Sequence, residues 1–115
     1  MWDSVKANKI AKKVNSEKHK NKLKQKCFLK FYEHVLAEIQ EEIKEESKLG
    51  RFKVELRFYN FNDSEYTKGL DDLDTREVVY LVEESIHRTL VEKGYKTSEI
   101  NEALIYGFAL KISWK

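Results

Sequence analysis

The sequence predicts an α+β fold, in which a small antiparallel or mixed sheet of about three strands has two to three helices packed on one face. Two long segments carry apolar residues at helical spacing, and two shorter ones alternate apolar with polar residues. Hydrophobic residues form 41% of the 115 residues, which supplies one core, and this length suits one domain. The expected order is (α)αβαββ, with residues 1–21 as a basic N-terminal helix or arm and residues 22–115 as a single α+β domain.

Two helical segments are expected before the first strand. Residues 22–48 repeat apolar side chains at spacings of three and four, the period of an amphipathic helix. Residues 3–20 have only a narrow, alanine-rich stripe, so we expect a helix or arm that needs a surface to dock on. Asn15 and Ser16 predict a break between the two segments, and Gly50 is expected to end the second. The narrow stripe consists of Ala7, Ile10, Ala11 and Val14.

The first strand and the next helix follow directly. Residues 51–61 alternate with period two, which is typical of a half-buried strand, and residues 62–73 are expected to form a polar loop. Asp74 and Glu77 have the spacing of a capping box. The helix is therefore expected to begin at Asp74 and to run to about Lys93, before Gly94.

Two further strands are expected to complete the sheet. Residues 95–97 form the shorter one, and residues 103–114 alternate without interruption. On the second face of the longer strand, Ile105, Gly107 and Ala109 are small or apolar. The middle of this strand is therefore expected to be covered on both sides.

Positive charge is concentrated at the start of the chain. Residues 1–30 contain ten lysines against Asp3 and Glu17, a balance of +8, whereas residues 31–50 have a balance of −4. Lysine clusters attract phosphate backbones through counterion release. Because arginine is missing there, we expect sequence-tolerant binding rather than base readout. The alternative is a solvated helical face that keeps the protein soluble. The candidate residues for binding an anion or a nucleic acid are Lys6, Lys9, Lys12, Lys13, Lys18, Lys20, Lys22, Lys24, Lys26 and Lys30.

Catalytic and metal-binding patterns are weak in this sequence. Cys27 is the only thiol and lies beside an apolar helix face, where cysteine usually acts as a small hydrophobe. His34 with Glu38, and Glu83 with His87, each share a helix face, but two ligands do not make a metal site. The four glycines are isolated, which excludes a glycine-rich phosphate loop. We therefore expect a protein that is not an enzyme, with no cofactor, no metal and no catalytic residue.

The cellular setting is expected to be the cytoplasm. A lone cysteine cannot form an internal disulfide, which favours a reducing compartment. The first residues lack the apolar run of a signal peptide, and apolar stretches fall far short of the ~20 residues that cross a bilayer. We expect no membrane partner.

Short segments in sequence order resemble a loose class of small bacteriophage and prophage proteins. They are Val5–Lys9, Ile43–Phe52, Leu90–Lys96 and Leu110–Trp114. The chain departs from that pattern with an extra basic stretch at residues 18–26 and a longer loop at residues 62–73. The resemblance implies a phage setting, in the cytoplasm of the host cell. Small accessory proteins there often bind host proteins, nucleic acid or signalling nucleotides.

Two functions follow as expectations. The first is a protein-interaction module, a homo-oligomer that also engages a host protein, because a sheet of about three strands leaves unpaired edges. The second is a nucleic-acid or nucleotide binder that uses the lysines of the first 30 residues. The two expectations are compatible, and the first covers the broader class.

Overall fold

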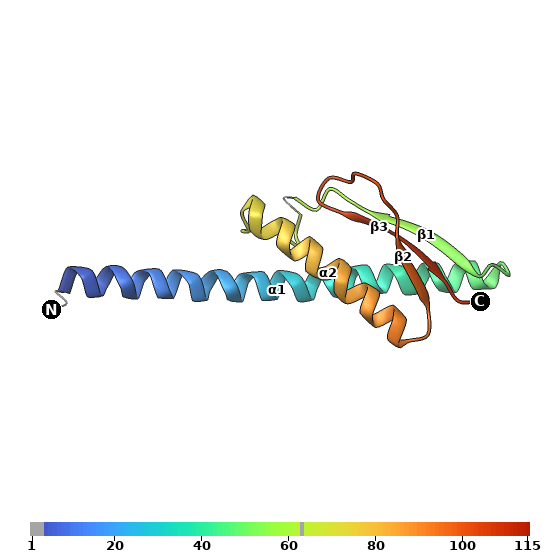
Figure 1. The fold of residues 1–115 in the computed structure, drawn as a ribbon, viewed down its shortest axis with the longest axis horizontal. Coiled ribbons are helices and arrows are strands. Elements are labelled where there is room, and N and C mark those ends of the chain that lie inside the picture. Colours follow the sequence, from blue (N-terminus) through green and yellow to red (C-terminus); the bar gives the residue numbers. More distant parts are fainter. Residues whose placement is uncertain (1–3, 63) are drawn as a thin grey trace.

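The structure is a computed structural model that describes residues 4–62 and 64–115, leaving out the side chains of residues 10 and 14–16. It contains one long helix, a second helix and a three-stranded sheet, which confirms the predicted α+β class (Figure 1). The elements are α1 (Ser4–Lys48), β1 (Lys53–Phe58), α2 (Asp72–Glu92), β2 (Lys96–Glu99) and β3 (Phe108–Ser113).

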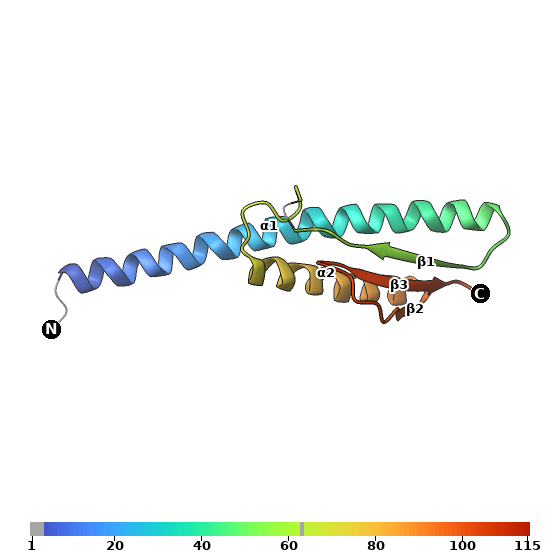
Figure 2. The same ribbon diagram turned by 90° about the horizontal axis from the view of Figure 1, so that it is seen from above.

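The sheet is antiparallel, with β3 between β1 and β2. Ile112 of β3 lies opposite Val54 on one side and Thr97 on the other, and these residues share the face that turns toward the helices. Helix α1 contacts β1, helix α2 contacts β2, and the two helices contact each other. The views in Figures 1 and 2 agree that both helices lie on the same side of the sheet.

The core lies between this face and the two helices. Leu110 and Ile112 of the central strand are fully buried, because a helix covers the strand and a neighbour flanks it on each side. The predicted coverage of both faces holds at Ala109, which is only 1% exposed although it points away from the helices. It is wrong at Ile105, which is 65% exposed and precedes the strand. The buried hydrophobic core comprises Phe31, Val35, Ile39, Ile43, Phe58, Val78, Val79, Val82, Ile86, Leu90, Phe108, Leu110 and Ile112.

The predicted break at Asn15 and Ser16 is wrong, because a single helix runs from Ser4 to Lys48. Asparagine and serine each cost a helix only a few tenths of a kcal/mol more than good helix formers, up to about 0.7 kcal/mol. No proline or glycine precedes Gly50, and extending an existing helix avoids the cost of a new nucleus. The helical conformation therefore extends from the part of α1 that packs in the core into the basic residues that precede it.

Two of the three predicted strands were too long, and left-handed residues explain where one ends and the other begins. Strand β1 ends at Phe58, shortly before Asn60, which has a φ of 61°. Strand β3 begins only at Phe108, because Tyr106 has a φ of 46° and turns the chain just before it. Strand β2 extends further than predicted, to Glu99.

The second helix starts before the predicted Asp74. Its N-cap is Asp71, whose side chain accepts a hydrogen bond of 2.8 Å from the backbone N–H of Asp74. Asp72 follows in the first turn, where a carboxylate suits the positive end of the helix dipole. The predicted capping box is therefore wrong, and Asp74 and Glu77 have another role.

Candidate nucleic-acid interface

The first half of α1 extends past α2 and the sheet as a free-standing rod (Figures 1 and 2). Between residues 4 and 22, every side chain that the structure describes is exposed. At about 1.5 Å per residue, these 19 residues span roughly 28 Å, a large share of the 71 Å length of the molecule. We call residues 4–22 the basic arm.

The basic arm carries lysines over most of its circumference. It contains seven lysines and a single acidic residue, Glu17. With about 3.6 residues per turn, neighbours such as Lys12 and Lys13 point roughly 100° apart. Lys18 and Lys20 point roughly 200° apart, whereas an arc of roughly 120° between Lys6 and Lys18, on which Ala7 lies, carries no lysine. The lysines therefore cover most of the circumference of the arm, but not all of it.

Repulsion between like charges opposes helix formation in this segment. Lysines four residues apart lie on neighbouring turns, and each such pair destabilises an isolated helix by about 0.2–0.5 kcal/mol. Two such pairs lie within the arm, Lys9 with Lys13 and Lys18 with Lys22. Three more continue the series beyond it: Lys20 with Lys24, Lys22 with Lys26, and Lys26 with Lys30. An anionic ligand that neutralises these lysines therefore stabilises the helix as it binds.

Lys24 fastens the arm to the body of the protein. Its Nζ lies 3.0 Å from a carboxylate oxygen of Glu77 and 3.6 Å from one of Asp74, both on α2. The hydrogen bond to Glu77, with the two carboxylates, raises the pKa of Lys24. Lys24 therefore forms ion pairs with carboxylates of α2, although the sequence analysis counted it among the candidate binding residues.

The other candidate lysines are exposed on α1 and lie along one continuous helix. Those in the basic arm are Lys6, Lys9, Lys12, Lys13, Lys18, Lys20 and Lys22, and those beside the body are Lys26 and Lys30. The side chains of Ile10 and Val14, which belong to the predicted apolar stripe, fall outside the described residues. Ala7, Ala11 and Val5 are exposed, with Val5 at 63%.

The lone thiol has no base beside it in the described chain. Cys27 is buried, and its Sγ lies 4.0 Å from the backbone oxygen of Lys68. Burial raises the pKa of this thiol, which opposes formation of the thiolate nucleophile. His34 is used elsewhere, since its Nε2 lies 3.1 Å from Glu38 and its ring stacks on Tyr66. Cys27 therefore acts as a small core residue.

A second group of titratable residues lies between α2 and β2. Burial and the charge of Glu99 raise the pKa of Glu83 to about 7, and burial lowers the pKa of His87. The Nδ1 of His87 lies 2.5 Å from the hydroxyl of Thr97. Within residues 4–62 and 64–115, no three acidic, histidine or cysteine side chains are placed to hold a metal ion. The sequence paired Glu83 with His87 but gave no signal for Glu99.

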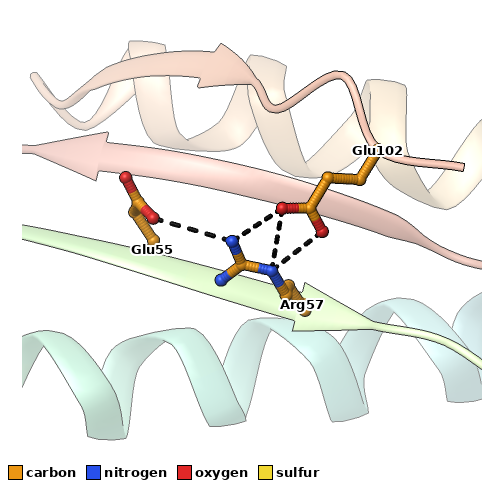
Figure 3. Close-up of polar contacts among 3 residues, drawn as sticks. All are labelled: Glu55, Arg57 and Glu102. Atoms are coloured by element: carbon orange, nitrogen blue, oxygen red, sulfur yellow. Dashed lines mark hydrogen bonds and ion pairs between the residues drawn. The ribbon is translucent and has the colours of Figure 1, made fainter. Parts of the chain in front are cut away.

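An ion pair on the outer face of the sheet was not visible in the sequence either. Figure 3 shows the guanidinium of Arg57, on β1, meeting the carboxylate of Glu102, from the segment after β2, over the central strand. Three hydrogen bonds of 3.1 Å, 2.9 Å and 2.7 Å join them, and Glu55 lies 3.8 Å from the same guanidinium. Arg57 lies opposite Ala109, whose small side chain leaves room for this bridge.

Comparison with models of protein families, with curated proteins and with solved structures found no match to this chain. The resemblance to small phage proteins therefore stays a prediction. The described helices include none whose length and apolar character would let it span a membrane.

Proposed function

We propose that this protein is a non-enzymatic binding protein whose basic arm contacts the phosphate backbone of a nucleic acid without reading its sequence. The observation that carries the proposal is the extension of lysine-rich residues 4–22 as an exposed helix away from the folded body. A helix about 10–12 Å wide also fits the major groove of B-DNA, which is about 12 Å wide.

The charge pattern supports contact with phosphates rather than with bases. Lysine presents a compact point charge on a flexible stem, whereas base recognition commonly uses the planar fork of arginine. The arm has seven lysines and no arginine. Its lysines cover most of the circumference of the rod, so binding tolerates a range of orientations of the helix about its axis.

A protein partner fits the described arm less well than a polyanion does. Helix-in-groove recognition uses apolar anchors at spacings of three and four, and interface energy concentrates in buried aromatic or arginine side chains. Among the described side chains of the arm, Val5 is the only large hydrophobic residue. The expected host-protein partner is therefore kept as an outcome of the test.

Fluorescence anisotropy with labelled 20-mer duplex DNA, single-stranded DNA and RNA tests the proposal across a salt titration. The triple variant Lys9→Gln, Lys12→Gln and Lys13→Gln removes three charges from the arm without shortening it. We expect its plot of log K against log salt to be shallower by about 2.7 for duplex DNA, since each phosphate contact contributes about 0.9. Scrambling the DNA sequence should leave the affinity unchanged.

The matched control is the triple variant Lys44→Gln, Lys96→Gln and Lys111→Gln, which removes the same charge from exposed positions outside the arm. It should keep the slope of the original protein. The proposal is wrong if no nucleic acid binds at about 20 mM salt, where electrostatic attraction is least screened. It is also wrong if polyglutamate competes as well as DNA of equal charge, because an acidic protein would then be the better partner.

A further inference from the structure

Strand β1 forms one edge of the sheet. The sheet order leaves β1 with one unpaired side in the described chain. The backbone N–H of Trp114 donates to the oxygen of Phe52, so the hydrogen-bonded positions of β1 toward β3 are the even-numbered ones. The main-chain groups of Lys53, Glu55 and Arg57 therefore point away from β3. A partner strand would find three residues with donors and acceptors facing outward.

We infer that two copies of this chain pair through their β1 edges, antiparallel, with a two-fold axis at Val54. In this register Lys53 of each copy lies opposite the second copy's Glu55 on the outer face of the sheet. On the inner face Phe52 lies opposite the second copy's Leu56. The two three-stranded sheets then form one sheet of six strands.

The charged side chains of β1 favour an axis at Val54 over an axis at Glu55. If the axis passed through Glu55, the two Glu55 carboxylates would face each other and Lys53 would face Arg57. Like charges directly opposite each other destabilise a strand pair, whereas opposite charges stabilise it. Lys53 and Glu55 are both exposed, so their side chains are available on the outer face.

The shape of the surface beside β1 also favours a two-fold axis at Val54. Phe52 is 50% exposed, which is unusual for a large aromatic side chain next to the core. A cleft of about 350 Å³ lies beside Leu56, and its lining residues are Leu56, Phe58, Arg57 and three glutamates of α1. With the axis at Val54, Phe52 of each copy reaches the cleft of the other. The exposed Phe52 ring then covers Leu56 and Phe58 in a cleft whose other lining residues are charged.

Charge-reversal variants test the inference by sedimentation velocity and light scattering, from about 1 to 500 µM, which brackets a weak dimer. The original chain is expected to dimerise within this range. Glu55→Lys alone and Lys53→Glu alone each place like charges opposite each other, so each is expected to stay monomeric. The double variant Lys53→Glu with Glu55→Lys restores both pairs and is expected to dimerise again.

A mixture of the two single variants tests the proposed register most directly. The two single variants, each monomeric alone, are expected to form a heterodimer at 1:1, because every pair across the axis then joins opposite charges. Lys96→Glu, an exposed position on β2 at the opposite edge of the sheet, is the control and should leave association unchanged. Phe52→Ala should weaken the dimer at least tenfold, whereas Leu73→Ala, an exposed apolar residue on α2, should not.

Circular dichroism must show that each variant is folded, which their exposed positions favour. A strict monomer at every concentration overturns the inference. Dimers that persist in both single variants overturn it as well, because the copies would then meet elsewhere. Failure of the mixed variants to pair, with the original chain dimeric, overturns the axis at Val54.

Discussion

Replacing Glu83 with glutamine should stabilise the protein above neutral pH and not in acid. Glu83 is half-buried where α2 faces β2. Burial, then the charge of Glu99, raises its pKa from 4.5 to about 7. Tyr80, Glu84 and His87 lie on the same helix, and Glu84 also raises this pKa. Ionised Glu83 therefore destabilises the fold, and the neutral amide of the Glu83→Gln variant removes that cost.

The sign of the pH dependence follows from proton binding. Between pH 4.5 and about 7 the folded chain binds a proton at Glu83 that the unfolded chain has lost. The contribution of Glu83 is therefore fully present below pH 4.5 and is lost as pH rises to about 7. At about 1.36 kcal/mol per pKa unit, a shift from 4.5 to about 7 corresponds to at most about 3.4 kcal/mol. Partial exposure to solvent reduces the expected effect to about 1–2 kcal/mol.

Urea denaturation of both proteins at pH 4.5 and pH 8 measures this effect. The Glu83→Gln variant should be more stable by about 1–2 kcal/mol at pH 8 and equal within about 0.5 kcal/mol at pH 4.5. Taking the difference between two proteins cancels the titration of His87, whose lowered pKa has the opposite pH dependence. The control is Glu92→Gln, an exposed carboxylate at the end of the same helix. An equal difference at the two pH values, or a larger one in acid, would refute the reasoning.

Three further outcomes are expected. Gly107→Ala places a methyl group 1.8 Å from the backbone oxygen of Phe58. Thermal denaturation should therefore show that the variant loses about 2–4 kcal/mol of folding stability. The control Gly94→Ala has open space around it and should lose only about 1 kcal/mol, because of its positive φ. Cys27 should react with iodoacetamide only as fast as the protein unfolds, because its thiol is buried with a raised pKa; labelling at the rate of free cysteine in native buffer would contradict its core position. Lys22→Glu exchanges two repulsive pairs for attractive ones. Helicity measured by circular dichroism at low salt should therefore rise, while DNA affinity falls. Unchanged helicity would indicate that like-charge repulsion does not limit helix formation in the arm.

Periodicity predicted the elements well because it reports directly on burial. The apolar repeat around Val35 and Ile39 marks the face of α1 that packs in the core, and the alternation around Leu110 marks the inner face of β3. Element ends were predicted less well, since they depend on single backbone angles. Asn60 and Tyr106 adopt positive φ values that neither residue type requires.

The candidate site was predicted in composition but not in shape. Charge counting located the lysines, yet it could not show that residues 4–22 leave the body as a continuous helix. Nor could it separate Lys24, whose partner Glu77 lies 53 positions along the chain. The same limit applies to Arg57 and Glu102, which are 45 positions apart. Such pairs exist only after the sheet and helices have assembled, and no local pattern specifies them.

The two proposals together determine how a dimer would meet nucleic acid. Helix α1 ends beside the start of β1, so a two-fold axis at Val54 brings the acidic ends of the two α1 helices together and directs the basic arms away from each other. Each α1 has 45 residues, so the arm tips would lie on the order of 100 Å apart. A duplex of 20 base pairs is shorter than this, at about 3.4 Å per base pair, and would contact one arm. The dimer should therefore bridge separate segments rather than grip a single site twice. Glu55→Lys should then keep the salt slope of the arm on a short duplex but lose the ability to link two long DNA molecules. If this variant still bridges DNA, the arms themselves must associate, and the β1 edge is not the joining surface.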